Sequence, residues 1–231
     1  MKRDVDKFAV RIGLKFIRPE LLVQAFTHRS YLNEHPSFAS EHNERLEFLG
    51  DAVLELVVTD HLFTCYPKSN EGELTAYRAA AVNAETLSEL ASELGINDYL
   101  LLSRGESKDT GRARQMILAN TFESVVGAIY LDQGLAAARG FVDKYLFPKI
   151  GAIVENQLWQ DAKSSFQERA QALRDVTPIY KVLEERGPDH NKVFVVGLYL
   201  NEELVAKGEG TSKQRAEQEA ARLGLERYGW I

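Results

Sequence analysis

Residues 41–57, EHNERLEFLGDAVLELV, decide the fold of this chain. At the roughly 100° per residue of an α-helix, they separate into two faces. The apolar face predicts packing against a core; it consists of Leu46, Leu49, Val53, Leu56 and Val57. The opposite face carries three acids at i, i+3 and i+7, which are Glu44, Glu47 and Asp51. One helix therefore presents both a core surface and an acidic row.

The acidic row has two interpretations. Adjacent carboxylates without an interleaved cation repel each other by about 0.2–0.5 kcal/mol per pair. The row is either a solvated face or a site for a hard divalent cation, because Mg²⁺ takes oxygen ligands. The neighbours favour the second interpretation. Phe48 lies beside the acids, away from the apolar face, and Gly50 sits inside the helix, where glycine costs about 1 kcal/mol relative to alanine.

Residues 42–54, HNERLEFLGDAVL, resemble without a gap the signature of bacterial ribonuclease III, an endoribonuclease specific for double-stranded RNA. Three further stretches show the same resemblance: THRSY at 27–31, NEGELT at 70–75 and the segment 78–87. The resemblance implies an all-helical nuclease domain, which we place at residues 4–150.

The bulk composition sets limits on the class of protein. The 231 residues allow one large or two small domains. The single cysteine, Cys65, excludes an internal disulfide and is predicted to be a small core residue. The first residues lack the apolar core of a signal peptide, so we expect a cytoplasmic protein without a membrane partner. The net charge of −6 argues against nucleic acid, but residues 159–231 are nearly balanced.

A second helix is predicted over residues 116–134, which are almost entirely apolar around Asn120 and Glu123. A buried carboxylate is costly unless it is paired or bound to metal. Glu123 therefore either pairs with an arginine such as Arg45 or faces the acids of the first helix. The resemblance favours the second choice, because Glu123 matches the catalytic glutamate of ribonuclease III. Asn120 stands where that family commonly has aspartate.

The sequence pattern changes at residue 161. A short amphipathic helix is followed by three strand candidates, IYKVLEERG, KVFVVGLYL and EELVAKGEG, and by a final helix. Thr211 and Gln214 are predicted to cap that helix. The order α-β-β-β-α resembles a double-stranded-RNA-binding domain. We therefore expect a mostly α protein with a linker at residues 151–160 and a small α+β domain at residues 161–229.

The resemblance also implies which residues of the second domain contact RNA. Such domains read the shape of the A-form duplex across two minor grooves and the phosphates between them. The matching positions are Ser164, Gln167 and Glu168 in the first helix, His190 and Asn191 in a loop, and Lys213, Gln214 and Arg215 at the start of the last helix. The family often has lysine at 214 and 217, so weaker phosphate contact is expected here. Taken singly, each residue is better explained by capping or solvation, whereas together and in this order they favour RNA.

The expected function follows from both resemblances. It is Mg²⁺-dependent hydrolysis of double-stranded RNA to 5′-phosphate and 3′-hydroxyl ends, in the processing of rRNA and mRNA precursors, with Mn²⁺ able to substitute. The implied metal ligands are Glu47, Asp51, Asn120 and Glu123, with Asp51 and Glu123 catalytic and Glu44 behind them. Phe48 is expected to insert into a pocket of the second protomer of a homodimer. The alternative is a double-stranded-RNA-binding protein with a degenerate, non-cleaving nuclease domain, which Asn120 favours and the retained acids disfavour.

Overall fold

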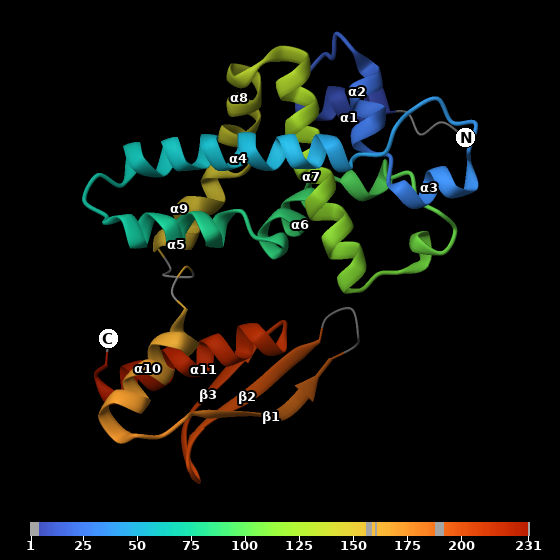
Figure 1. The fold of residues 1–231 in the computed structure, drawn as a ribbon. Helices are drawn as coiled ribbons and strands as arrows, with labels where there is room; N and C mark the ends of the chain where they lie inside the picture. The colour runs from blue at the N-terminus through green and yellow to red at the C-terminus, as the bar shows by residue number, and fades with distance from the viewer. Residues whose placement is uncertain (1–4, 156–158, 160, 188–191, 231) are drawn as a thin grey trace. The chain divides into compact units, whose positions relative to one another are not determined.

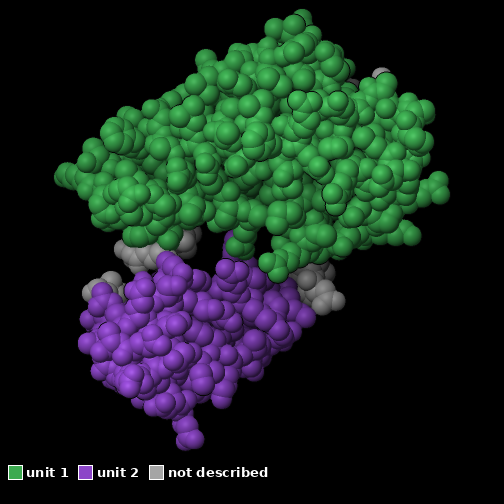
Figure 2. Space-filling model, in the orientation of Figure 1, with its two compact units in different colours: residues 1–159 green, residues 160–231 purple. Residues whose placement is uncertain are grey.

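The computed structural model describes residues 5–155, 159, 161–187 and 192–230. The chain divides into two compact units, residues 1–159 and residues 160–231 (Figures 1 and 2). Each has its own hydrophobic core, so each is described by itself. No helix within the described ranges is long and apolar enough to cross a membrane.

The first unit is built from helices. Their bounds are α1 Val5–Ile12, α2 Pro19–Ala25, α3 Arg29–Glu34, α4 Glu44–Cys65, α5 Glu71–Ala81, α6 Ala84–Glu93, η1 Ile96–Asp98, η2 Glu106–Lys108, α7 Arg112–Gln133, α8 Leu135–Tyr145 and α9 Phe147–Glu155. The only β-type pairing in its described residues is an isolated bridge between Thr27 and Leu101. The expectation of an all-helical first domain is therefore confirmed.

The two longest helices, α4 and α7, cross at the centre of this unit (Figure 1). The predicted apolar character of α7 is confirmed, because Phe122, Val125 and Ile129 are fully buried. The α4 helix contributes Leu54 and Val58, which are also fully buried. The crossing thus forms the core around which the other helices pack.

Local signals fix the helix ends that position these elements. Asn70 and Glu73 form a capping box at the start of α5, with bonds of 3.0 and 2.9 Å between each side chain and the other residue's backbone N–H. The α6 helix ends at Glu93 with Leu94 as its C-cap residue, and the chain then turns at Gly95, whose φ of 69° lies in the left-handed region that glycine adopts without strain.

Three expectations for the first unit are corrected by the structure. Cys65 is exposed and not part of the core, and Leu56 on the predicted apolar face is 57% exposed. Both lie in the second half of α4, where one side of the helix is left uncovered. Residues 151–155, assigned to the linker, lie in α9, and Ile153 is buried in the core.

The second unit has the expected order α-β-β-β-α. Its elements are α10 Ala162–Arg174, β1 Ile179–Arg186, β2 Val193–Leu200, β3 Glu203–Gly210 and α11 Lys213–Tyr228. The strands form an antiparallel sheet in the order β1-β2-β3. Phe166 of α10, Leu198 of β2 and Ala220 of α11 are fully buried in one cluster, so both helices cover the same sheet face.

The cap of α11 differs from the predicted one. Ser212, not Thr211, is the N-cap residue, and its hydroxyl accepts a 3.2 Å hydrogen bond from the backbone N–H of Arg215. The helix therefore begins one residue later than the pair Thr211 and Gln214 implies. Two adjacent hydroxyl residues satisfy the same capping pattern, so the sequence could not distinguish them.

Candidate active site

The α4–α7 crossing brings the predicted acids together. Glu47 and Asp51 lie on α4, and Glu123 lies on α7. The pKa of Glu123 is raised to about 8, first by burial and then by the negative charges of Asp51 and Glu47. The second interpretation of Glu123 is thus the one the structure adopts: it faces the acids of α4.

The competing arginine partner for Glu123 is not found. Arg45 instead lies 3.7 Å from Glu41, four residues earlier in the chain. Among the described residues, no ion pair joins Glu47, Asp51 or Glu123 to a lysine, arginine or histidine. The negative charge at the crossing is therefore uncompensated by side-chain cations.

Asn120 belongs to the same group. Its side chain lies near the Glu47 carboxyl and acts to lower the pKa of that group. Burial acts in the opposite direction and is the larger effect, and the charges of Glu44 and Asp51 add to it, so the pKa of Glu47 is raised overall. The residue that departs from the expected aspartate is thus in contact with the acidic row.

Glu44 stands apart from the other acids because an arginine lies beside it. Arg29 lies 3.6 Å from one of its carboxylate oxygens, and His42 lies 3.8 Å from the other. The Arg29 side chain is 72% exposed. We expected Glu44 to lie behind the metal ligands, and its pairing with Arg29 fits that expectation.

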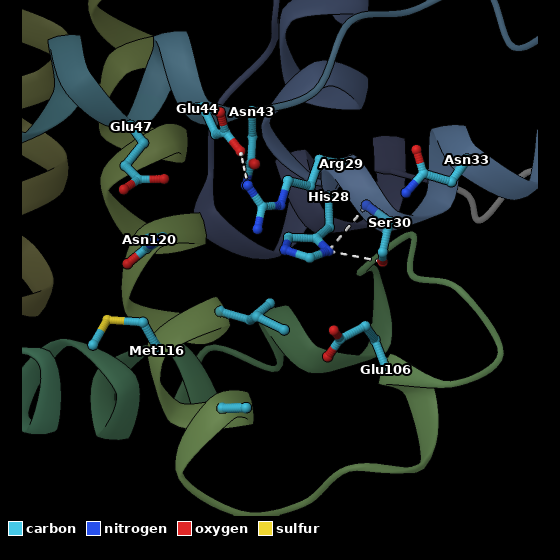
Figure 3. A pocket seen from close by; sticks show the side chains of 12 residues that line it. His28, Arg29, Ser30, Asn33, Asn43, Glu44, Glu47, Glu106, Met116 and Asn120 are labelled. Carbon is cyan, nitrogen blue, oxygen red and sulfur yellow. Dashed lines mark hydrogen bonds and ion pairs between the residues drawn. The ribbon is translucent and has the colours of Figure 1, made fainter. Parts of the chain in front are cut away.

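An open pocket of about 620 Å³ adjoins the crossing (Figure 3). Glu44 and Glu47 of α4 and Met116 and Asn120 of α7 line one part of it. The remaining wall comes from His28, Arg29, Ser30, Asn33, Asn43, Glu106, Ala113 and Ile117. Asp51 and Glu123 do not line this pocket, so the acids extend beyond it along the crossing.

His28 and Arg29 are pocket residues that the sequence argument did not single out. The His28 Nδ1 atom accepts a 3.3 Å hydrogen bond from the Ser30 backbone N–H and lies 2.8 Å from the Ser30 hydroxyl. Burial lowers the pKa of His28, so its ring is neutral at pH 7 with the proton on Nε2. The signal was available, since both residues fall in the THRSY stretch that carried part of the resemblance.

The acids offer the oxygen ligands that a divalent cation takes, but they are not gathered around one point. In the described part of the chain, no group of three or more His, Cys, Asp or Glu side chains is gathered closely enough to hold a metal ion. The available donors are nevertheless all oxygens, from three carboxylates and the Asn120 amide, and Mg²⁺ takes such donors. Burial, and then the neighbouring Asp51 and Glu47, raise the pKa of Glu123. The residues therefore fit a hard divalent cation in donor type and charge.

Phe48 is exposed, as the helical pattern predicted. Its side chain is 81% accessible, next to Glu47 on α4. Met116 on α7 is also 51% exposed. Burying an aromatic side chain of this size stabilises an interface by about 1.5–3 kcal/mol. Phe48 is therefore available for contact with another chain.

The predicted RNA-binding residues all belong to the second unit. His190 and Asn191 lie outside the described residues. Gln167 and Glu168 are exposed on α10. Ser164 is tied to the N-cap residue, with its hydroxyl donating a 2.6 Å bond to the Asp161 carboxylate.

At the other end, Lys213 and Gln214 are exposed in the first turn of α11, together with Arg215. The Lys213 ammonium lies 3.3 Å from Glu185 of β1. The Lys213 charge is thus shared with a carboxylate. At position 217, where the family often has lysine, Glu217 pairs with Lys163.

Known proteins resemble both units. A family model described as Ribonuclease-III-like matches residues 18–150, and one described as a double-stranded RNA binding motif matches residues 162–228. A Ribonuclease 3 of Carboxydothermus hydrogenoformans is 45% identical over 93% of this chain and 92% of its own. One from Anoxybacillus flavithermus is 48% identical over 95% and 92%. The crystal structure of a nuclease domain of ribonuclease III from Campylobacter jejuni matches 64% of this chain and 96% of its own, with 35% identity and a TM-score of 0.57.

Proposed function

The chain belongs to the ribonuclease III family and is an endoribonuclease of double-stranded RNA, and from this premise we propose how its residues divide the work. Nucleases of this family depend on a metal ion, and we propose that the ion is Mg²⁺, with Mn²⁺ able to replace it. The observation that carries the proposal is the meeting of Glu47 and Asp51 on α4 with Glu123 on α7, with no ion pair to a cationic side chain among the described residues. A divalent cation would balance these carboxylates and favour the ionised form of Glu123, whose pKa is raised to about 8 without it.

The ligands would be Glu47 and Asp51 from α4 and Asn120 and Glu123 from α7. Glu44 is the less suitable ligand, because it already pairs with the Arg29 guanidinium. When bound, Mg²⁺ supplies charge neutralisation at the phosphate and acidifies a water molecule. In the hydrolysis, water gives its oxygen to phosphorus and a proton to the departing 3′ oxygen, which leaves a 5′-phosphate and a 3′-hydroxyl.

The side chains of the crossing have separate tasks in this scheme. Asp51 is exposed and Glu123 is half-buried, so Asp51 meets the reacting phosphate from the solvent side while Glu123 acts from within the crossing. The Asn120 side chain lies beside Glu47 and favours the ionised form of its carboxyl. We propose Asp51 and Glu123 as the catalytic residues.

Duplex binding is the task of the second unit. We propose contacts through Ser164, Gln167 and Glu168 of α10, through His190 and Asn191, and through Lys213, Gln214 and Arg215 at the start of α11. The free N–H groups of the first turn of α11 favour phosphate there. The Lys163–Glu217 pair removes one cation from this surface, which supports the expectation of weaker phosphate contact than in lysine-rich relatives.

A homodimer would supply the second nuclease site that cutting both strands needs. One solved structure from Campylobacter jejuni concerns a region involved in dimer formation of its nuclease domain. For the present chain, the exposed Phe48 supports a symmetric contact. We propose the cytoplasm as its location, rRNA and mRNA precursors as its substrates, and the end of α9 as the limit of the nuclease domain.

The proposal is tested with a long RNA duplex and the full chain at several Mg²⁺ concentrations. Cleavage to fragments with 5′-phosphate ends is expected with Mg²⁺ and not with excess EDTA. Equal cutting in EDTA would refute the metal requirement. Binding without any cleavage would revive the alternative of a non-cleaving double-stranded-RNA-binding protein, which finds no support in the relatives.

A further inference from the structure

The backbones of α4 and α7 touch at two glycines. A Cβ atom on Gly50 would lie 2.7 Å from the carbonyl carbon of Glu123 and 2.9 Å from the backbone nitrogen of Gly127, and closer still to the Glu123 carbonyl oxygen. A Cβ atom on Gly127 would lie 3.1 Å from the Gly50 nitrogen and would collide with the Leu46 carbonyl oxygen. Since these obstacles are backbone atoms, no side-chain adjustment can relieve them. Neither helix can carry a side chain at this contact.

The contact lies among the proposed ligands. Gly50 directly precedes Asp51 and follows Glu47 by three residues. On the other helix, the backbone atoms that face Gly50 belong to Glu123 itself. The spacing of the two backbones at this point therefore sets how far the Glu123 carboxylate stands from those of Glu47 and Asp51.

A buried hydroxyl also links the same helices near this contact. The Ser124 hydroxyl lies 3.3 Å from the Asn43 carbonyl oxygen at the start of α4 and 2.8 Å from the Asn120 carbonyl oxygen in α7, so its one proton is shared between these two acceptors. Asn43 is 2% exposed and is itself fixed, because its backbone N–H donates to Thr27 at 2.9 Å and its side chain donates to Ala25 at 3.3 Å. Figure 3 shows Glu47 and Asn120 on these two neighbouring helices, beside the pocket. The crossing is thus fixed both at the glycines and at the first turn of α4.

We propose that Gly50 and Gly127 are positioning residues of the nuclease site, which let α4 and α7 touch so that Glu123 reaches the ion held by Glu47 and Asp51. The inference rests on the proposed metal-dependent function. Mg²⁺ accepts oxygen ligands only near 2.0–2.1 Å. A displacement of about 1 Å in the reacting geometry reduces turnover by about 100-fold. A single methyl group at either glycine is large enough to cause such a displacement.

The test uses the full chain with Gly50→Ala and Gly127→Ala. Gly140→Ala on α8 is the matched control, because a Cβ there meets nothing within 4 Å. Ser124→Ala is a milder variant that releases the hydrogen bond to Asn43 without adding bulk. For each protein, the melting temperature and duplex binding are measured in EDTA, Mn²⁺ affinity by calorimetry, and kcat and KM with an RNA duplex in Mg²⁺.

We expect Gly50→Ala and Gly127→Ala to bind Mn²⁺ about 10-fold more weakly and to lower kcat about 100-fold. Duplex binding in EDTA and KM should stay within about twofold of the parent, since the change acts on the reacting geometry and not on the RNA contacts. Ser124→Ala should weaken Mn²⁺ binding in the same direction by less. Gly140→Ala should match the parent in every measurement.

Folded glycine variants with parental Mn²⁺ affinity and kcat would overturn the inference. So would a loss of duplex binding in parallel with Mn²⁺ affinity, since that indicates general damage. If both glycine variants fail to fold, Ser124→Ala decides: parental Mn²⁺ affinity refutes the positioning role, and weakened affinity with intact duplex binding supports it. Absence of Mg²⁺-dependent cleavage by the parent would refute the proposed function, a result separate from these comparisons.

Discussion

Among the carboxylates of the α4–α7 crossing, Glu123 is the one whose pKa is raised furthest. Glu123→Gln should abolish cleavage while leaving duplex binding nearly intact, because the affinity for RNA comes mainly from phosphate contacts made elsewhere. Cleavage assays in Mg²⁺ and gel shifts in EDTA measure the two properties separately. Loss of binding in proportion to loss of cleavage would show that Glu123 supports the RNA-binding surface instead.

The same substitution should change how the metal-free protein responds to pH. The pKa of Glu123 is about 8 in the folded chain against an ordinary value of 4.5. Between these values the folded state keeps a proton that the unfolded state releases, so stability falls as the pH rises, by a few kcal/mol in total. Below the lower value the carboxyl is neutral in both states and costs nothing.

Glu123→Gln should therefore raise the melting temperature in EDTA at pH 8 and have little effect near pH 4.5, the ordinary pKa of the group. Glu55→Gln, an exposed position on α4, is the control and should show no such pH-dependent gain. A constant gain at all pH values would mean that burial of the charge is not its cause.

Asn120 stands where the sequence resemblance led us to expect aspartate. Asn120→Asp adds a negative charge beside Glu47 and removes the amide that favours the ionised form of that carboxyl. The variant should need less Mg²⁺ for half-maximal rate, because charge attracts the ion, but should be less stable without metal. Mg²⁺ titrations of both proteins measure this. An unchanged or higher Mg²⁺ requirement would place Asn120 outside the metal's ligands.

At the scale of the element, α4 shows both the power and the limit of sequence reasoning. Its period of about 3.6 residues put the acids on one face and left Phe48 exposed, and both expectations hold in the structure. The exposure of Leu56 and Cys65 was not foreseeable, because periodicity defines a face without saying how far along it the neighbouring helices reach. The closeness of the glycine contact also depends on a partner helix that is distant in sequence.

Phe48 should determine whether two copies of the chain associate as a dimer. Phe48→Ala removes about 1.5–3 kcal/mol of apolar burial per protomer, counted twice in a symmetric dimer. Sedimentation should then show monomer at micromolar concentrations where the parent is dimeric. Phe63→Ala is the control on the same helix, since Phe63 is also exposed at 73%. Equal behaviour of the two variants would remove the special role of Phe48.

For the whole molecule, the two units should separate binding from cutting. A chain ending at Trp159 keeps the packing of that indole against Tyr77, whose ring centroids lie 4.8 Å apart. It retains the complete core of the first unit and should cleave duplex RNA only at low salt, because it lacks the module that spans about 16 base pairs. Cleavage rates across a salt series test this. Parental activity at physiological salt would show that the first unit binds RNA unaided.

The exposed thiol at the end of α4 has a practical consequence. Cys65 is the chain's single cysteine, so a maleimide or nitroxide reagent can attach one probe per protomer without mutagenesis. In a two-fold assembly the paired probes report a single distance by fluorescence transfer or electron spin resonance, and in a monomer they report none. During storage without reductant, the same thiol can form a disulfide between two molecules. On a denaturing gel without reductant, that species would look like a dimer.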